Sequence, residues 1–276
     1  MIHRAYLYAP WHGVVKTESQ IGERQRVDRE LEEARKIARQ IARSVAIPKF
    51  YQEKIREVER SRRLFRSSPP VRECLTLVTK REDRIGHGIV HVRKVAIDAG
   101  AISLIENGHV LPKPEVRRMV LLAHIAGVLH DIRRLEKDHA RVSAGEAAKL
   151  LAIFDLSAHE VAAITGAIGN HEAFRPADPL KDPAARFLSD ALYDADKFRW
   201  GPDNFTEMLW DMVEYRKASL DAVLTRFLRG MEGIKRIRDT FRTCTGKIYG
   251  PDFIDRGIEI GTKFYEAIVK KGRKCL

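Results

Sequence analysis

The segment of residues 119–129 limits the possible folds more than any other part of the chain. It is apolar on nearly every face of a helix, and it ends in the dipeptide His130-Asp131. A helix that is hydrophobic all round runs through the interior of a protein. The segment is too short for a membrane span, which needs roughly 20 apolar residues, and His124 interrupts it. We therefore expect it to be the central helix of a soluble protein.

The region around this helix also has the pattern of helices. Between residues 70 and 200, apolar residues recur at helical spacing and the β-branched runs do not alternate with period two, so no sheet of any size is expected. Helix breaks are expected at Gly100, at Pro112 and Pro114, near Asp138, and from Pro176 to Pro183. Three further amphipathic segments follow Gly201-Pro202, at residues 205–228, 231–244 and 252–269. The expected fold is all-α, with a core over residues 70–200 and C-terminal helices of residues 201–276 packed on it.

Residues 1–69 are expected to form a basic helical arm. The stretch 18–66 has no glycine after Gly22, and Pro48 divides it into two helical candidates. Six apolar residues of the first candidate recur at steps of three and four: Val27, Leu31, Ala34, Ile37, Ala38 and Ile41. The sequence Ser67-Ser68-Pro69-Pro70 is expected to be a linker. Such an arm would cover a functional site or form the contact of a homodimer.

The formal net charge of the chain is +12, and most of it lies outside the expected core. Residues 1–69 carry +7 (16 − 9), residues 70–200 carry +1 (19 − 18) and residues 201–276 carry +4 (15 − 11). A basic surface attracts nucleic acid, acidic lipid headgroups or phosphorylated small molecules, and charge does not choose among them. The N-terminus has no apolar signal segment, and the three cysteines fit neither a disulfide framework nor a zinc site. We expect a cytoplasmic protein without a membrane partner.

Six side chains form an ordered set with the ligand types of a transition-metal site: His91, His130, Asp131, His139, His171 and Asp196. Imidazole nitrogen together with carboxylate oxygen suits Mn, Fe, Ni, Co or Zn, whereas oxygen ligands alone would indicate Mg or Ca. Asp131 follows a buried helix, where a carboxylate without a compensating charge is costly. A metal ion would compensate it, and so would an ion pair with Arg133, Arg134 or Lys137.

Five segments of the chain match, in order, the H…HD…H…H…D pattern of a known superfamily. They are His91-Val-Arg-Lys-Val-Ala, Leu129-His130-Asp131-Ile132, Asp138-His139-Ala-Arg-Val-Ser-Ala-Gly145, Asn170-His171-Glu172 and Asp194-Ala-Asp196-Lys197. Over roughly residues 80–200 the chain resembles the HD-domain metal-dependent phosphohydrolases. The resemblance implies an HD-type helical core that binds one or two divalent metal ions.

Carried over by position, the resemblance gives the first metal four ligands: His91, His130, Asp131 and Asp196. Asp131 would bridge to a second metal, for which His139 and His171 match the additional ligands. The chain departs from the pattern at Arg133, where a glycine often follows, and at Asn170, where the cyclic-dinucleotide branch has a histidine. That branch's Gly-Tyr-Pro signature is also absent. These departures argue against cyclic-di-GMP as the substrate.

Spacing bears on the number of metals. His139 lies eight positions after Asp131 (139 − 131), enough for a turn, and His171 lies 32 positions after His139 (171 − 139), enough for two antiparallel helices. Both histidines can therefore reach Asp131, which favours two metals over one. At two of the ligand positions a neighbouring residue could serve as the ligand instead. His87 would share a helix face with His91, and Asp194 lies two residues before Asp196; in each pair the second residue fits the pattern better.

The resemblance implies hydrolysis of a phosphomonoester or phosphodiester, nucleotide-like or another small phosphorylated molecule, by metal-activated water. The candidate catalytic carboxylates are Asp131 and Glu172, the latter as a proton acceptor or as a group that orients a ligand. Four basic residues near the ligands are candidates for binding the substrate phosphate: Arg133, Arg134, Lys137 and Lys197.

Two alternative functions use the same residues. Di-iron oxygenases of the HD superfamily also carry the H…HD…H…H…D pattern, and they activate dioxygen. A non-enzymatic signalling or nucleic-acid-binding protein could retain the fold as a scaffold, with the basic arm as its contact surface. The complete ligand set argues against the scaffold, and the arm lacks interleaved aromatic residues for stacking on bases.

Overall fold

The computed structural model describes residues 18–79 and 88–274, with side chains described for residues 26–79 and 88–270. Within these ranges it contains helices and no strand, which confirms the expected all-α fold. The elements, in chain order, are α1 (Glu18–Ser44), α2 (Lys49–Glu53), α3 (Ile55–Ser67), α4 (Pro69–Thr79), α5 (Ile89–Asn107), α6 (Lys113–Leu129), α7 (His139–Leu151), α8 (Ala158–Gly169), α9 (Pro183–Lys197), the 3₁₀ turn η1 (Phe198–Trp200), the π-helical turn η2 (Asn204–Met208), α10 (Leu209–Arg216), α11 (Leu220–Ile237) and α12 (Cys244–Lys274). None of the described helices is long and apolar enough to span a membrane.

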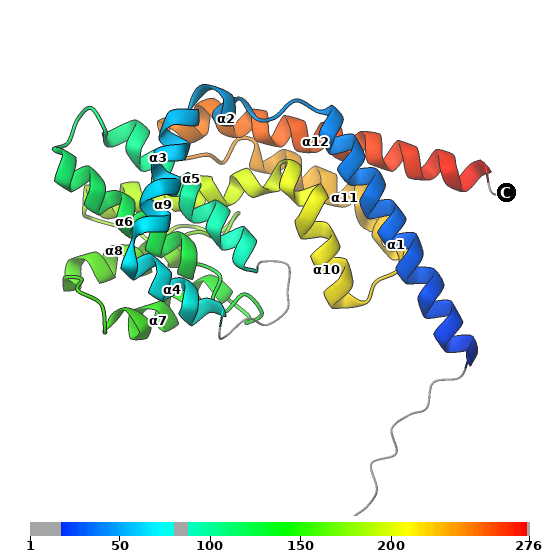
Figure 1. Cartoon of the computed structure of the whole chain (residues 1–276), viewed down its shortest axis with the longest axis horizontal. Coiled ribbons are helices and arrows are strands. Elements are labelled where there is room, and N and C mark those ends of the chain that lie inside the picture. Colours follow the sequence, from blue (N-terminus) through cyan, green and yellow to red (C-terminus); the bar gives the residue numbers. More distant parts are fainter. Residues whose placement is uncertain (1–17, 80–87, 275–276) are drawn as a thin grey trace, which may run out of the picture.

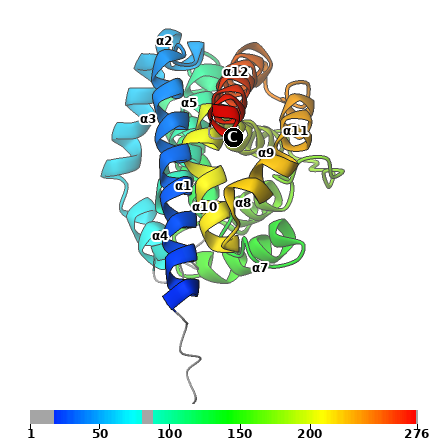
Figure 2. The same cartoon turned by 90° about the vertical axis from the view of Figure 1, so that its right-hand side faces the viewer.

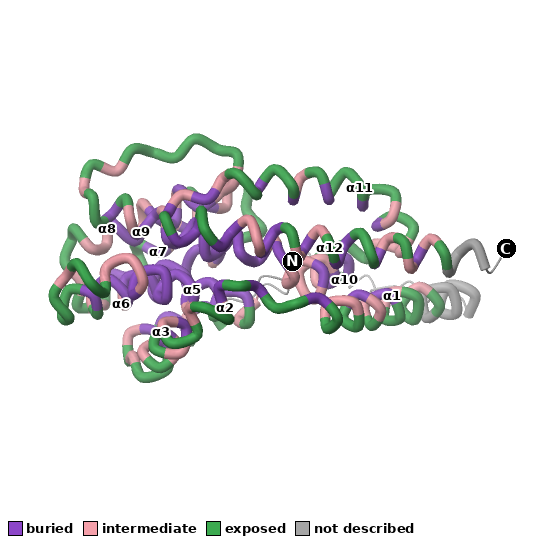
Figure 3. The backbone as a smooth tube through the Cα atoms, turned by 90° about the horizontal axis from the view of Figure 1, so that it is seen from above, coloured by how far each residue is buried: buried purple, intermediate pink, exposed green. Residues whose placement is uncertain are grey.

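Helices α5 and α6 form the centre of the molecule, and α6 contains the apolar segment that was expected there. Figure 3 shows most of both helices as buried. The two helices are antiparallel, because His91 lies against His130 at one end and Gly100 lies against His124 further along. A Cβ atom at Gly127 would collide with the backbone of Ala96, so glycine at this crossing permits the close approach of the helices.

The helix break expected at Gly100 is wrong, because α5 continues through it to Asn107. A Cβ atom at Gly100 would collide with the ring of His124 and with the hydroxyl group of Ser61. The glycine therefore makes room for a buried polar contact instead of ending the helix. The other expected breaks are confirmed: α6 begins after Pro112, α7 begins after Asp138, and α9 begins at Pro183.

His124 gives the fold a dependence on pH. Its Nε2 atom lies 2.9 Å from Oγ of Ser61, and burial lowers the pKa of His124 from 6.5 to about 3. Between these two values the unfolded chain takes up a proton at this residue and the folded chain does not. The free energy of unfolding should therefore fall, as pH falls below 6.5, by about 1.4 kcal/mol per pH unit on account of His124.

Urea unfolding of the wild type and His124→Leu between about pH 6.5 and pH 4.5 measures this effect. The difference in unfolding free energy, wild type minus variant, should decrease steadily as pH falls. Other groups that titrate in this range cancel in the difference. A difference that stays constant with pH would show that His124 does not have the depressed pKa.

The helices of the expected N-terminal arm all contribute to the buried core. The side chains of Phe50, Val58 and Phe65 on α2 and α3 belong to the same buried core as the central helices, and Ser61 donates a hydrogen bond to the carbonyl oxygen of Ile97 in α5. Helix α1 adds Ala34 and Ala38 to this core and lies against α12, η2 and α11. Figures 1 and 2 show its course past the C-terminal helices. The core thus crosses the expected division between residues 69 and 70. The expected linker is also shorter, since α4 begins at Pro69.

The C-terminal helices pack on the core, but their bounds differ from those expected. The segment 205–228 is interrupted where Lys217 has a positive φ of 50° and where the Ser219 side chain caps α11 by accepting a hydrogen bond from the backbone of Ala222. Helix α11 then runs through the break expected near residue 230, and α12 begins eight residues before the expected 252 (252 − 244). Phe253 of α12 stacks on Phe198 with ring centroids 4.2 Å apart, which fixes α12 against η1.

Candidate metal centre

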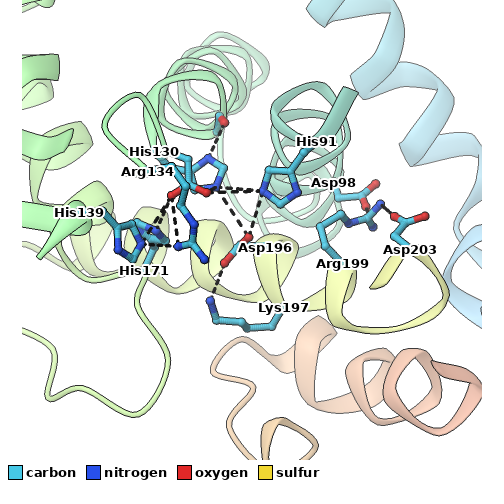
Figure 4. Close-up of polar contacts among 12 residues, drawn as sticks. His91, Asp98, His130, Arg134, His139, His171, Asp196, Lys197, Arg199 and Asp203 are labelled. Atoms are coloured by element: carbon cyan, nitrogen blue, oxygen red, sulfur yellow. Dashed lines mark hydrogen bonds and ion pairs between the residues drawn. The ribbon is translucent and has the colours of Figure 1, made fainter. Parts of the chain in front are cut away.

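Six side chains meet where the ends of five helices come together. Figure 4 shows five of them, His91, His130, His139, His171 and Asp196, with the contacts that join them. Each of the six lies at or near a helix end, where it can face a common point. They are His91 in the first turn of α5, His130 and Asp131 directly after α6, His139 at the start of α7, His171 after α8, and Asp196 in the last turn of α9. These are the six residues that the sequence pattern selected, and the antiparallel helices α7 and α8 return the chain as the spacing predicted.

The two carboxylate oxygens of Asp131 face different pairs of histidines. Its Oδ2 atom lies 3.5 Å from Nε2 of His130 and 4.0 Å from Nε2 of His91. Its Oδ1 atom lies 3.3 Å from Nε2 of His171 and 3.6 Å from Nε2 of His139. One buried carboxylate therefore lies between two sets of imidazole donors.

Asp196 completes the set of donors that contains His91 and His130. Its Oδ1 atom lies 3.4 Å from Nε2 of His91 and 3.7 Å from Nε2 of His130, and the two Nε2 atoms are 3.3 Å apart. Ligand atoms on one transition metal lie roughly 3 Å apart, because each bond is about 2.1 Å long. The six residues form three overlapping groups in which the candidate ligand atoms lie within 4.8 Å of one another, so they fit a metal ion.

Backbone carbonyl groups orient two of the imidazoles. The Nδ1 atom of His130 lies 2.8 Å from the carbonyl oxygen of Gly127, and Nδ1 of His171 lies 2.6 Å from that of Ile168. Because a carbonyl oxygen only accepts, each Nδ1 carries a hydrogen and each Nε2 is left to face the cluster. The buried Nε2 atom of His171 makes no hydrogen bond within the described residues. This is the arrangement of a metal-binding histidine.

The charges of the cluster favour a cation. Burial opposes the charged form of His130, but Asp131 and Asp196 outweigh it and raise the pKa of His130. Burial also opposes ionisation of Asp196, yet Lys197 and the two neighbouring histidines hold its pKa well below the usual 3.8. His139 behaves differently: burial, assisted by Arg134, lowers its pKa to about 4 and keeps its imidazole neutral and able to act as a ligand.

Local interactions hold the loops that carry these residues. After α6, the backbone N–H of Arg133 donates to Oγ of Ser143 in α7 at 3.1 Å. After α8, Asn170 and Asp178 exchange two hydrogen bonds of 2.9 and 2.8 Å, which close the loop behind His171. Asn170, which departs from the sequence pattern, therefore stabilises the loop that carries His171.

The structure also places Asp194, the alternative to Asp196 as a ligand. The carboxylate of Asp194 points away from the cluster and accepts hydrogen bonds from the backbone N–H groups of Arg242 and Thr243 and from the Thr243 hydroxyl, at 2.7 to 2.9 Å. Asp196, the residue favoured from the sequence, is the one in the cluster. His87 lies outside the described residues.

The candidate phosphate-binding residues lie at different distances from the cluster. Nη1 of Arg134 is 2.6 Å from Nε2 of His139 and 3.8 Å from Oδ1 of Asp131. Lys197 is buried and its Nζ atom lies 2.5 Å from Oδ2 of Asp196. Arg133 instead faces Glu146 at 3.8 Å, and Lys137 is exposed on the same turn.

Glu172 is not part of the cluster, although it follows His171 directly. Its carboxylate pairs with the guanidinium group of Arg175 at 2.9 Å. The structure therefore brings together the six candidate ligands with Arg134 and Lys197, and it does not bring Glu172, Arg133 or Lys137 to them.

One residue near the site could not be found from the sequence pattern. Arg242, in the loop between α11 and α12, lies over the ring of Tyr193 at 3.6 Å and donates to the carbonyl oxygen of Asn170 at 3.2 Å. It ties the loop that carries His171 to the C-terminal helices. The sequence does not indicate that Arg242 lies near the site, because it is far along the chain from the motif and only the folded chain brings α12 next to α9.

Comparison with known proteins adds no relative: no protein-family model, no curated protein and no solved structure matches the chain.

Proposed function

We propose that the chain is an HD-type metal-dependent phosphohydrolase, which hydrolyses a phosphomonoester or phosphodiester. The observation that carries the proposal is the position of Asp131, with one oxygen toward His91 and His130 and the other toward His139 and His171. A carboxylate that bridges two metals in this way is a common feature of centres that cleave phosphate esters.

The first metal would be held by His91, His130, Asp131 and Asp196, and the second by Asp131, His139 and His171. Bound divalent metals lower the pKa of water toward neutrality and neutralise the charge of a phosphate group. The chain contributes the geometry: Gly127 and Ile168 fix two imidazoles through their carbonyl groups, and Lys197 holds the carboxylate of Asp196.

Two basic side chains beside the cluster, those of Arg134 and Lys197, support a phosphate substrate over an uncharged one. Arg134 has a partly exposed side chain, so its guanidinium can turn from His139 to a phosphate oxygen, for which its planar fork of donors is suited. Lys197 is committed to Asp196 and acts chiefly by orienting that carboxylate. Arg134 is therefore the residue to which we assign phosphate binding.

The test is release of phosphate from an aryl phosphate by the purified full chain. We expect release that requires Mn, Fe, Co, Ni or Zn and stops when a chelator removes the metal. No release with any of these metals would contradict the proposal. Iron-dependent oxygen uptake in the absence of phosphate release would identify the protein as an oxygenase instead.

A further inference from the structure

A cavity of about 350 Å³ lies between η2, α10 and α11. This volume falls within the range of sites that enclose small molecules. Its walls are mainly apolar, with Phe205, Met208, Leu209, Val223, Phe227 and Met231 among the lining residues. Unbranched methionine side chains adapt to flexible apolar ligands, which favours an aliphatic chain over a rigid ring.

The cavity adjoins the candidate metal centre through two residues. Arg134 lines the cavity, and its guanidinium also contacts His139 in the cluster. Trp200 lines the cavity too, and Nζ of Lys197, which binds Asp196, lies 5.9 Å from the centre of its ring. Arg134 therefore lies both in the cavity wall and beside the cluster.

The charged residues of the cavity select for an anion. Arg134, Arg216 and Arg226 line it, and none of the described residues in its lining is acidic. Asn204 is the remaining polar lining residue among those described, too few polar groups to recognise a nucleobase by its hydrogen-bonding edge. Positive charge around an apolar interior complements a molecule with an anionic head and an apolar tail.

We propose that the substrate is an amphiphilic phosphomonoester, whose aliphatic chain occupies this cavity while its phosphate reaches the metal centre. The inference rests on the proposed phosphohydrolase function. In the reaction, the oxygen of water forms a bond to phosphorus and the bond from phosphorus to the ester oxygen breaks. The ester oxygen takes up a proton from the water, and the products are the free alcohol and inorganic phosphate.

Binding of non-hydrolysable alkyl phosphonates tests the cavity separately from hydrolysis. With the full chain in Mn²⁺, calorimetry should show the dissociation constant falling about fourfold for each methylene added, or about 250-fold from ethyl to hexyl phosphonate. The amphiphiles are kept below the concentration at which they aggregate. Equal affinities for the two phosphonates would overturn the inference.

Two glycines of α11 provide a variant and a matched control. Neither has an atom within 4 Å of an added Cβ, but Gly230 lines the cavity and Gly233 does not. Gly230→Leu should reduce the ethyl-to-hexyl affinity ratio at least tenfold, because its side chain fills the space for the alkyl chain, whereas Gly233→Leu should keep the wild-type ratio. The same ratio in both variants would place the alkyl chain elsewhere.

Hydrolysis of ethyl and hexyl phosphate separates the two proposals. If chain length strengthens phosphonate binding and neither phosphate is cleaved, the cavity assignment stands and the phosphohydrolase function fails. If both phosphates are cleaved with the same kcat/KM, the function stands and the cavity assignment fails.

Discussion

Replacement of Asp131 by asparagine should remove metal binding and phosphate release together. Asp131 is buried, and it is the residue that both pairs of histidines face. Asparagine keeps the shape of the side chain but loses the negative charge and one of the two oxygen ligands. Changes to groups that only support a ligand reduce metal affinity or activity about 10- to 100-fold, so loss of this shared ligand should exceed 100-fold. Metal content after desalting and the rate of aryl phosphate hydrolysis measure both effects.

Asp138→Asn is the matched control for this change. Asp138 lies seven residues further along (138 − 131), and its carboxylate pairs with Arg175 at 2.8 Å on the surface. Its φ of 56° is in the left-handed region, which asparagine also adopts readily. The control should therefore keep its metal and keep its rate within about threefold, since exposed ion pairs contribute little. A folded Asp131→Asn protein that retains stoichiometric metal would remove Asp131 from the ligand set.

Replacement of His171 by alanine should lower the metal content from two ions per chain to one. His171 and His139 face Oδ1 of Asp131. His91 and His130 instead face Oδ2 of Asp131 and Oδ1 of Asp196. Loss of His171 therefore removes a ligand from one half of the centre and leaves His91 with its partners intact. Equilibrium dialysis followed by elemental analysis gives the number of ions per folded chain.

His109→Ala is the control for that experiment, because His109 is exposed in the turn between α5 and α6. It should bind as much metal as the wild type. One ion per chain in the wild type, unchanged in His171→Ala and in His139→Ala, would show that the chain holds a single metal on His91, His130, Asp131 and Asp196.

The sequence predicted those parts of the fold and site that depend on local pattern. The apolar run before His130 identified the central helix, and proline marked the starts of α6 and α9. The six candidate ligands could be selected because they follow the order of the H…HD…H…H…D pattern, and the structure places each of them at or near a helix end.

The errors concern features that depend on contacts between distant segments. Gly100 has the appearance of a helix breaker, but it is needed because His124 and Ser61 approach from two other helices. The stripe on α1 was expected to belong to an appended arm, yet its Ala34 and Ala38 are buried in the same core as Phe50 of α2. The position of Glu172 could not be predicted either, since a residue next to a ligand can face Arg175 as readily as the cluster.

The metal content of the wild-type chain tests the central claim most directly. The full chain, freed of metal and then dialysed against an excess of Mn²⁺, Fe²⁺ or Zn²⁺, is analysed for metal after the unbound ions are removed. Our account predicts two ions per folded chain of at least one of these metals, with metal binding lost in Asp131→Asn. A folded wild-type chain that retains none of them would contradict it.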